Sequence, residues 1–249
     1  DGTEKSGKGG KKDCKEIIMK KVHRFFADLS WQGKQGEILD RETVHQLSRV
    51  LRIKPGEELV ILDGKGEEFR VRVHEVKKDV VSVDLLGRKA IMTEPAVQVT
   101  LYASVLKRES FDWAVQKAVE CGVTRIVPII STHTIKTGIK QDRLQAIAKE
   151  AAEQCGRAKI PEVSHTMSFE QALADAKSCD RIVFADTYLP ESEPMQKTRA
   201  IALFIGPEGG WSDEEREQAK SAGATALSLG KLILRGETAC AVGVHLLTS

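Results

Sequence analysis

A glycine loop near the end of the sequence carries residues suited to ligand chemistry. Residues 204–215 read FIGPEGGWSDEE, an apolar strand followed by a glycine loop and a helix start. Such a layout usually holds a phosphate on backbone N–H groups at a positive helix end. Here Glu208 lies in the loop and three more acids follow in the first helical turn, so an anion would be repelled. The pattern favours a neutral or cationic ligand.

A second loop follows about twenty residues later. Residues 229–239 read LGKLILRGETA, in which a strand ends at Gly230 and a final helix begins within ETAC. S-adenosylmethionine fits the two loops, since it has no phosphate, carries a sulfonium cation and presents an adenine that main-chain groups can recognise. Gly206, Gly209 and Gly210 would admit close backbone approach to it. The alternative is an ordinary strand-to-helix turn that needs its glycines for positive φ.

The elements that must position these loops are strands alternating with helices. The expected strands are residues 97–106, 124–130, 181–186, 200–206 and 225–230, and the helices between them include residues 110–122, 142–156 and 168–178. This alternation predicts a parallel sheet covered by helices, with ligands bound beyond the carboxyl ends of the strands. Two capping boxes are expected, Ser168 with Gln171 and Ser212 with Glu215.

The N-terminal part has a different pattern, typical of a small barrel. Strands are expected at residues 57–63, 68–76 and 79–86, joined by tight turns, after a helix that Asp40 caps. That helix should bury four apolar residues at helical spacing, Val44, Leu47, Val50 and Leu51. In the middle strand, apolar residues at 69, 71 and 73 alternate with Arg70, Arg72 and His74, which gives either an RNA-facing or an ordinary solvated surface. Residues 87–96 look like a linker.

Composition narrows the function classes. The net charge is +2, so RNA binding would depend on local basic patches. The five scattered cysteines have no zinc-ligand spacing, and we expect them to be reduced and mostly buried, with no metal. There is no membrane segment or signal peptide, which predicts a cytoplasmic protein. Residues 1–18 are too polar to fold and are either a vector-derived tail or a basic RNA-tethering arm.

Several motifs together resemble the SPOUT class of methyltransferases, and within it the RsmE family of 16S ribosomal RNA uridine N3-methyltransferases. They are HRFF, HQLSRVLRIKPGE, QKAVECGV with IVPI, EAAEQCGRAKIPEV, FIGPEGG and LGKLILRGETA. Cys121, Lys231 and Leu232 depart from the family pattern. The resemblance implies an α/β fold in which a SPOUT trefoil-knot methyltransferase domain, residues 91–249, follows a PUA-like RNA-binding β-barrel, residues 19–90. It also implies a homodimer that acts on 16S rRNA in the small ribosomal subunit.

The resemblance also implies site residues. S-adenosyl-L-methionine would bind to Ile205, Gly206, Pro207, Glu208, Gly209, Gly210, Leu229, Gly230, Ile233, Leu234, Arg235, Thr238 and Ala239. RNA would contact Arg24, Arg49, Arg52, Arg70, Arg72 and Arg157, with His45 and His133 either touching RNA or serving the structure. Trp113 is expected in the core or on the dimer surface.

Arg235 is the predicted catalytic residue. Uracil N3 becomes nucleophilic when its proton leaves and charge spreads onto O2 and O4, and a cation near O4 would stabilise that charge. The alternative for Arg235 is a structural salt bridge to Glu237 or a bond to a C-terminal carbonyl. The proton acceptor is left open among Glu237, Glu208 and water.

Two other functions compete with this reading. One is a catalytically silent RNA-binding protein that does not bind S-adenosylmethionine. The other is a Rossmann-type nucleotide enzyme, which the missing GxGxxG after the first strand, the missing GKS/T and the acid within GPEGG all oppose.

Overall fold

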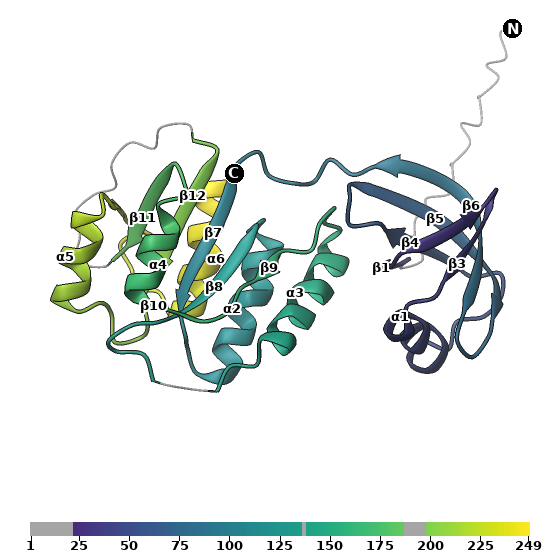
Figure 1. Ribbon diagram of the computed structural model, residues 1–249, viewed down its shortest axis with the longest axis horizontal. Coiled ribbons are helices and arrows are strands. Elements are labelled where there is room, and N and C mark those ends of the chain that lie inside the picture. Colours follow the sequence, from purple (N-terminus) through teal and green to yellow (C-terminus); the bar gives the residue numbers. More distant parts are fainter. Residues whose placement is uncertain (1–21, 136–137, 187–197) are drawn as a thin grey trace, which may run out of the picture.

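The computed structural model describes residues 22–135, 138–186 and 198–249, which form two parts joined by a short linker (Figure 1). The predicted tail, residues 1–18, lies outside the described residues. The first part is a six-stranded sheet in the order β1-β4-β5-β6-β3-β2. Its elements are β1 His23–Phe26, β2 Leu29–Gln32, β3 Gln35–Ile38, α1 Arg41–His45, the π-helix η1 Gln46–Val50, β4 Glu58–Leu62, β5 Glu67–Val76 and β6 Val81–Ala90.

The expected antiparallel strands of this sheet are confirmed. β4 pairs with β5 and β5 with β6, all antiparallel. Along β5, Phe69, Val71 and Val73 are buried while the residues between them are exposed. The apolar face therefore closes a core and the basic face meets solvent.

The first helix differs from its expected pattern. Asp40 caps it as predicted, since its Oδ2 accepts from the main-chain N–H and the hydroxyl of Thr43. Leu47 is fully buried, but Val50 is 66% exposed. The helix widens into η1, where Leu51 N–H donates to Gln46 O, and the wider turn carries Val50 away from the core. The expectation that Val50 and Leu51 belong to the buried face was wrong.

The hairpin of β2 and β3 was not predicted. Its strands are short and mostly polar, and Gln32 pairs with Gln35 across the turn that Gly33 forms with φ 67°. Gly36 is needed beneath Trp31, because a Cβ at Gly36 would lie 2.9 Å from that ring. Ring packing across the hairpin replaces the hydrophobic alternation that usually reveals a strand.

The second part is a seven-stranded parallel sheet, as predicted, in the order β10-β8-β7-β12-β11-β13 with β9 against β8. Its strands are β7 Gln98–Ser104, β8 Arg125–Ile130, β9 Glu162–Val163, β10 Met167–Ser168, β11 Arg181–Ala185, β12 Ala200–Ile205 and β13 Thr225–Leu227. Its helices are α2 Arg108–Glu120, α3 Gln141–Cys155, α4 Phe169–Ala176, α5 Asp213–Ser221 and α6 Gly236–Thr248.

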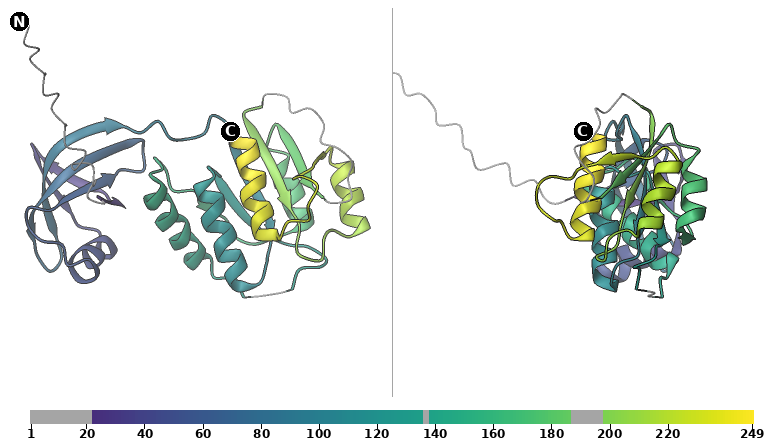
Figure 2. Two further views of the ribbon diagram at one scale, coloured as in Figure 1. Left: turned by 180° about the vertical axis from the view of Figure 1, so that it is seen from behind. Right: turned by 90° about the vertical axis from the view of Figure 1, so that its left-hand side faces the viewer.

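Helices cover both faces of this sheet (Figure 2). Side chains of α2, α3 and α6 share one buried cluster with alternate residues of the central strands, among them Leu101 and Leu203. Side chains of α4 and α5 share the opposite cluster with their neighbours Tyr102 and Phe204. Because helices bury both faces of the sheet, a ligand can reach it only through the loops at the strand ends, and in parallel sheets ligands bind beyond the carboxyl ends.

Three further expectations can be compared with the fold. β6 extends to Ala90, so the first residues of the predicted linker are strand. The four described cysteines form no disulfide among themselves, but only Cys240 is buried, so the expectation of mostly buried cysteines was wrong. Burial raises the pKa of the Cys240 thiol to about 12. Within the described ranges, no helix has the length and apolar character needed to cross a membrane.

Candidate functional site

A pocket of about 390 Å³ lies where three parallel strands end. Its walls are formed by Asp186, directly after β11, by the loops after β12 and β13 and by the first turn of α6. The lining residues are Ala185, Asp186, Ile205, Gly206, Pro207, Glu208, Gly210, Trp211, Leu227, Ser228, Leu229, Gly230, Lys231, Leu232, Ile233, Leu234, Arg235, Gly236 and Ala239. Both glycine loops singled out in the sequence thus open into one cavity.

The glycines of the GPEGG loop have different roles. Gly210 has φ 71°, and its N–H donates to Pro207 O in a tight turn. A Cβ at Gly206 would lie 3.0 Å from the buried Trp211 ring, whose Nε1 donates to Ala185 O. A Cβ at Gly209 would lie 2.9 Å from Cβ of His133. Gly209 therefore has no room for a Cβ because His133 packs on it, and its close approach to a ligand stays a prediction.

The helix after this loop is self-capped, as predicted. Ser212 Oγ accepts from Glu215 N–H and Glu215 Oε2 accepts from Ser212 N–H. The other oxygen of Glu215 accepts from Thr132 N–H, in the loop after β8, over 2.8 Å. The carboxylate is 5% exposed and bonded on both oxygens. The N–H groups of Ser212 and Glu215 are thus taken by the Glu215 carboxylate and the Ser212 hydroxyl, which leaves the helix start poorly suited to an anionic ligand.

Arg235 stands at the opposite wall as the N-cap residue of α6. The helix start is packed tightly, because a Cβ at Gly236 would lie 2.7 Å from Leu106. The Arg235 side chain is exposed, and it forms no hydrogen bond or ion pair with any other residue in the described part of the chain. The alternative of a salt bridge to Glu237 is therefore not formed among these residues, and the guanidinium remains available at the pocket.

Most residues of the predicted cofactor set line this pocket. Gly209 and Thr238 do not, and the assignment of the others to a cofactor stays a prediction. Asp186, missed by sequence reasoning, lines the pocket and pairs with Arg216 over 2.6 Å. It is the last residue of the predicted strand RIVFAD, so the rule that ligands bind at the carboxyl ends of parallel strands would have found it. The other missed residues are Ala185, Trp211, Leu227, Ser228, Lys231, Leu232 and Gly236.

The pocket fits S-adenosylmethionine in its chemistry. Its walls combine apolar side chains such as Leu227 and Leu234 with exposed main chain of the glycine loops. Glu208 borders it with a carboxylate, which suits a ligand with a positive centre, whereas the Asp186 carboxylate is already paired with Arg216. In the described ranges, no group of three or more His, Cys, Asp or Glu residues could hold a metal ion.

The predicted RNA residues fall into two environments. Arg24, Arg49 and Arg52 are exposed on the barrel. Arg70 and Arg72 are exposed too, but both pair with Glu58, at 2.6 and 3.1 Å. Arg24 and Arg70 line a groove of about 1360 Å³ on the barrel, together with His23, Arg88 and Lys89 among others. Their contact with RNA stays a prediction.

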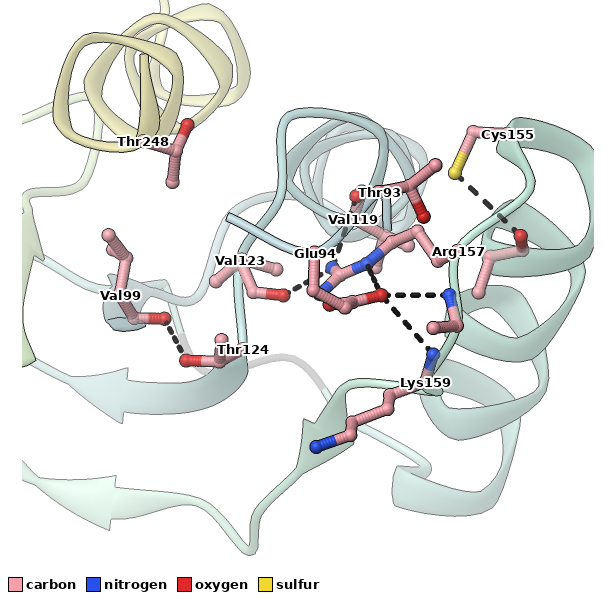
Figure 3. Close-up of polar contacts among 12 residues, drawn as sticks. Thr93, Glu94, Val99, Val119, Val123, Thr124, Cys155, Arg157, Lys159 and Thr248 are labelled. Atoms are coloured by element: carbon pink, nitrogen blue, oxygen red, sulfur yellow. Dashed lines mark hydrogen bonds and ion pairs between the residues drawn. The ribbon is translucent and has the colours of Figure 1, made fainter. Parts of the chain in front are cut away.

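Arg157 does not fit its predicted role. Its side chain is buried and pairs with Glu94 over 2.5 Å, and it also donates to the main-chain oxygens of Val119 and Val123 (Figure 3). Glu94 Oε1 accepts further from Ala158 N–H over 2.8 Å. Arg157 thus holds the interdomain linker on the end of α3, and we correct its assignment as an RNA contact.

Two sequence profiles match the chain. Residues 93–248 match the RNA methyltransferase domain, and residues 39–86 match the RNA methyltransferase PUA domain. The first match alone spans more than half of the chain. The chain belongs to this RNA methyltransferase family.

Individual relatives show which methyltransferases of this family the chain is similar to. The chain is 28% identical over 237 residues to ribosomal RNA small subunit methyltransferase E of Bacillus subtilis, covering 88% of this chain and 93% of that protein. It is 31% identical over 214 residues to the protein of the same name from Synechocystis, covering 81% of this chain and 69% of that protein. The resemblance to the RsmE family is thereby confirmed.

Solved structures show the same architecture. A ribosomal RNA small subunit methyltransferase E from Neisseria gonorrhoeae, bound to S-adenosyl methionine, superposes with a TM-score of 0.81 at 31% identity, covering 90% of this chain and 96% of that one. A putative methyltransferase from Legionella pneumophila in complex with the same cofactor superposes with a TM-score of 0.82 at 30% identity, covering 91% of this chain and 96% of that one. The expected fold class, a SPOUT α/β trefoil-knot domain after a PUA-like barrel, is confirmed by these neighbours.

Proposed function

We propose that the chain is an S-adenosylmethionine-dependent methyltransferase that methylates N3 of a uridine in 16S ribosomal RNA of the small subunit. The observation that carries the proposal is the pocket formed by both glycine loops, with an arginine at its edge that has no partner among the described residues. The similarity to methyltransferases solved with the same cofactor supports the identity of the ligand.

The cofactor supplies an electrophilic methyl group on a sulfonium, and the protein has to align the acceptor with it. We assign the cofactor to the main chain of residues 205–210 and 229–235 and to the first turn of α6. The carboxylate of Glu208 favours the positive centre. Arg235 holds the target base and stabilises the negative charge that spreads onto its oxygens when N3 loses its proton. Catalysis then depends on alignment and charge.

The barrel and a second copy of the chain complete this proposal. Arg24, Arg49 and Arg52 supply exposed cations for RNA phosphates, which fix the register of the RNA without reading its sequence. Leu232, Ile233 and Leu246 are 80%, 85% and 50% exposed, an apolar surface that a homodimer would cover. The reaction takes place in the cytoplasm, where the small subunit is assembled.

The proposal is tested by single-turnover methylation of small ribosomal subunits that lack the modification, with the modified nucleoside identified by mass spectrometry. Calorimetric titration with S-adenosylhomocysteine, NADP and ATP runs beside it. We expect methylation at N3 of a single uridine and binding of S-adenosylhomocysteine alone. RNA binding without cofactor binding would instead support the silent RNA-binding protein, and binding of NADP or ATP would support a nucleotide enzyme.

A further inference from the structure

The loop after β8 lies against the GPEGG loop. The two are joined by His133, whose Nδ1 lies 3.0 Å from Gly210 O, and by Glu215, which accepts from Thr132 N–H. Gly210 itself lines the pocket. His133 therefore packs directly against the loop that borders the proposed methyl donor.

The hydrogen bond to Gly210 fixes the tautomer of His133. A carbonyl oxygen can only accept, so Nδ1 carries the hydrogen and donates it. In the neutral ring, Nε2 then has a free lone pair, and the side chain is exposed. Nε2 is thus the atom of this side chain that can accept a proton.

The ring is held by more than one contact. The Cβ of His133 packs on Gly209, because a Cβ added at Gly209 would lie only 2.9 Å from it. The turn beneath it is fixed by hydroxyls, since Ser131 Oγ lies 3.0 Å from Ser104 Oγ and 2.7 Å from Thr134 Oγ1. A catalytic side chain needs support of this kind, in which an exposed imidazole is held by a turn of hydrogen-bonded hydroxyls.

We propose that His133 Nε2 accepts the N3 proton of the target base during methyl transfer, an inference that rests on the proposed function. The N3–H bond breaks and its proton moves to Nε2, the N3–methyl bond forms, and the sulfonium–methyl bond breaks to leave a neutral thioether. Histidine becomes imidazolium, and its Nδ1–H remains on Gly210 O. Charge balances without a metal or a further reactant. Arg235 on the opposite wall stabilises the oxygens of the base.

Two substitutions separate this role from a structural one. His133→Asn keeps an amide N–H near the position of Nδ1, so the bond to Gly210 O and the loop contact are retained, but Nε2 is removed. His133→Gln keeps a polar group near the position of Nε2 that cannot take the proton. We expect both variants to bind S-adenosylhomocysteine as wild type does and to methylate small subunits about a hundredfold or more slowly in single turnover.

The pH profile supplies a readout that a structural role would not change. In wild type, the single-turnover rate should depend on pH through this proton transfer, and His133→Asn should lose that dependence. The charged groups on the neighbouring elements are Glu208 in the glycine loop and Asp213, Glu214 and Glu215 in the first turn of α5, and they are unchanged in the variant. Imidazole added to His133→Ala should restore part of the rate.

The outcomes are distinct. A His133→Asn enzyme that methylates within about threefold of wild type, where a general base supplies roughly a hundredfold or more, overturns the inference and leaves the proposed function intact. Loss of S-adenosylhomocysteine binding in His133→Asn also overturns it, because His133 then supports the cofactor loop. A wild-type protein that methylates no small-subunit RNA overturns both.

Discussion

The main-chain N–H of Phe26 in the barrel donates a 2.8 Å hydrogen bond to Oε1 of Glu153 on α3. Phe26, Val60 and Leu62 belong to the same buried cluster as Ala148 and other α3 residues. The barrel is therefore packed on the methyltransferase part through a shared apolar core. Its groove has a fixed position relative to the pocket, and removal of the barrel would expose the covered face of α3.

Substitutions at Glu153 should separate the contribution of its hydrogen bond from that of its charge. Glu153→Ala leaves Phe26 N–H buried without an acceptor, which should lower the free energy of unfolding by about 1 to 3 kcal/mol. Glu153→Gln keeps an acceptor and should be neutral or stabilising at pH 7. Urea unfolding of both variants measures the difference. An Ala variant as stable as wild type would show that water replaces the carboxylate.

The pH dependence at Glu153 has a definite sign. Burial raises the pKa of its carboxyl, and the bond from Phe26 N–H offsets this only in part. A raised folded-state pKa means that the folded protein binds the extra proton, so this group stabilises the fold at low pH and loses that contribution as pH rises through its folded pKa. The stability advantage of Glu153→Gln over wild type should therefore grow with rising pH and vanish on acidification.

Sequence reasoning succeeded where the determinant was local. The capping boxes, the strand and helix alternation and the two glycine loops each depend on a few adjacent residues, and the structure contains them. It failed where the partner was distant. Arg157 was assigned to RNA from the family resemblance, and its true partner Glu94 lies 63 residues away. His133 was left undecided as an isolated histidine, and its partner Gly210 lies 77 residues away. Polar hairpins such as β2 and β3 lack the hydrophobic alternation that would have shown them.

The linker ion pair gives a second stability prediction. Arg157→Ala leaves Glu94 half-buried without its cation, and should cost about 3 to 5 kcal/mol, as removal of one partner of a buried pair does. Burial alone would raise the pKa of the Glu94 carboxyl, but Arg157 and two backbone N–H groups outweigh it and lower the pKa. The stabilisation is thus present above the unfolded pKa of Glu94 and is lost as pH falls through its lower folded pKa. Denaturant unfolding of Arg157→Ala and wild type across the acidic range checks both points.

The barrel arginines should differ in their effect on RNA affinity. Arg24, Arg49 and Arg52 carry exposed guanidiniums, and replacing one with Ala should reduce the slope of log affinity against log salt by about 1 if it contacts a phosphate. Arg70 already pairs with Glu58, so Arg70→Ala should change the slope less. Filter binding to ribosomal RNA over a salt series measures each slope. Equal slopes for Arg24→Ala and wild type would remove Arg24 from the RNA surface.

The cofactor pocket can be tested by filling it. Ala239 lines the pocket from α6, so Ala239→Val adds two methyl groups there. Overpacking of this kind costs about 1 to 3 kcal/mol, which should weaken S-adenosylhomocysteine binding roughly tenfold. Ala241→Val is the matched control, because Ala241 lies on the same helix and is not among the residues that line the pocket. Calorimetry that finds Ala239→Val unchanged would place the ligand elsewhere.

Arg235 should act on the chemical step and leave cofactor affinity nearly unchanged. Its guanidinium is exposed at the pocket edge and has no partner among the described residues, so its removal disturbs no ion pair there. Loss of a charge-assisted contact to the target base should cost about 2 to 4 kcal/mol, roughly a hundredfold or more in rate. Arg235→Lys keeps the charge but loses the planar fork, so it should be nearly as slow as Arg235→Ala if orientation matters.

Single-turnover methylation by both variants, read beside S-adenosylhomocysteine binding, decides between three roles. Slow methylation with normal binding marks a contact to the target base, near-normal rates mark a surface residue, and lost binding moves Arg235 to the wall of the cofactor pocket.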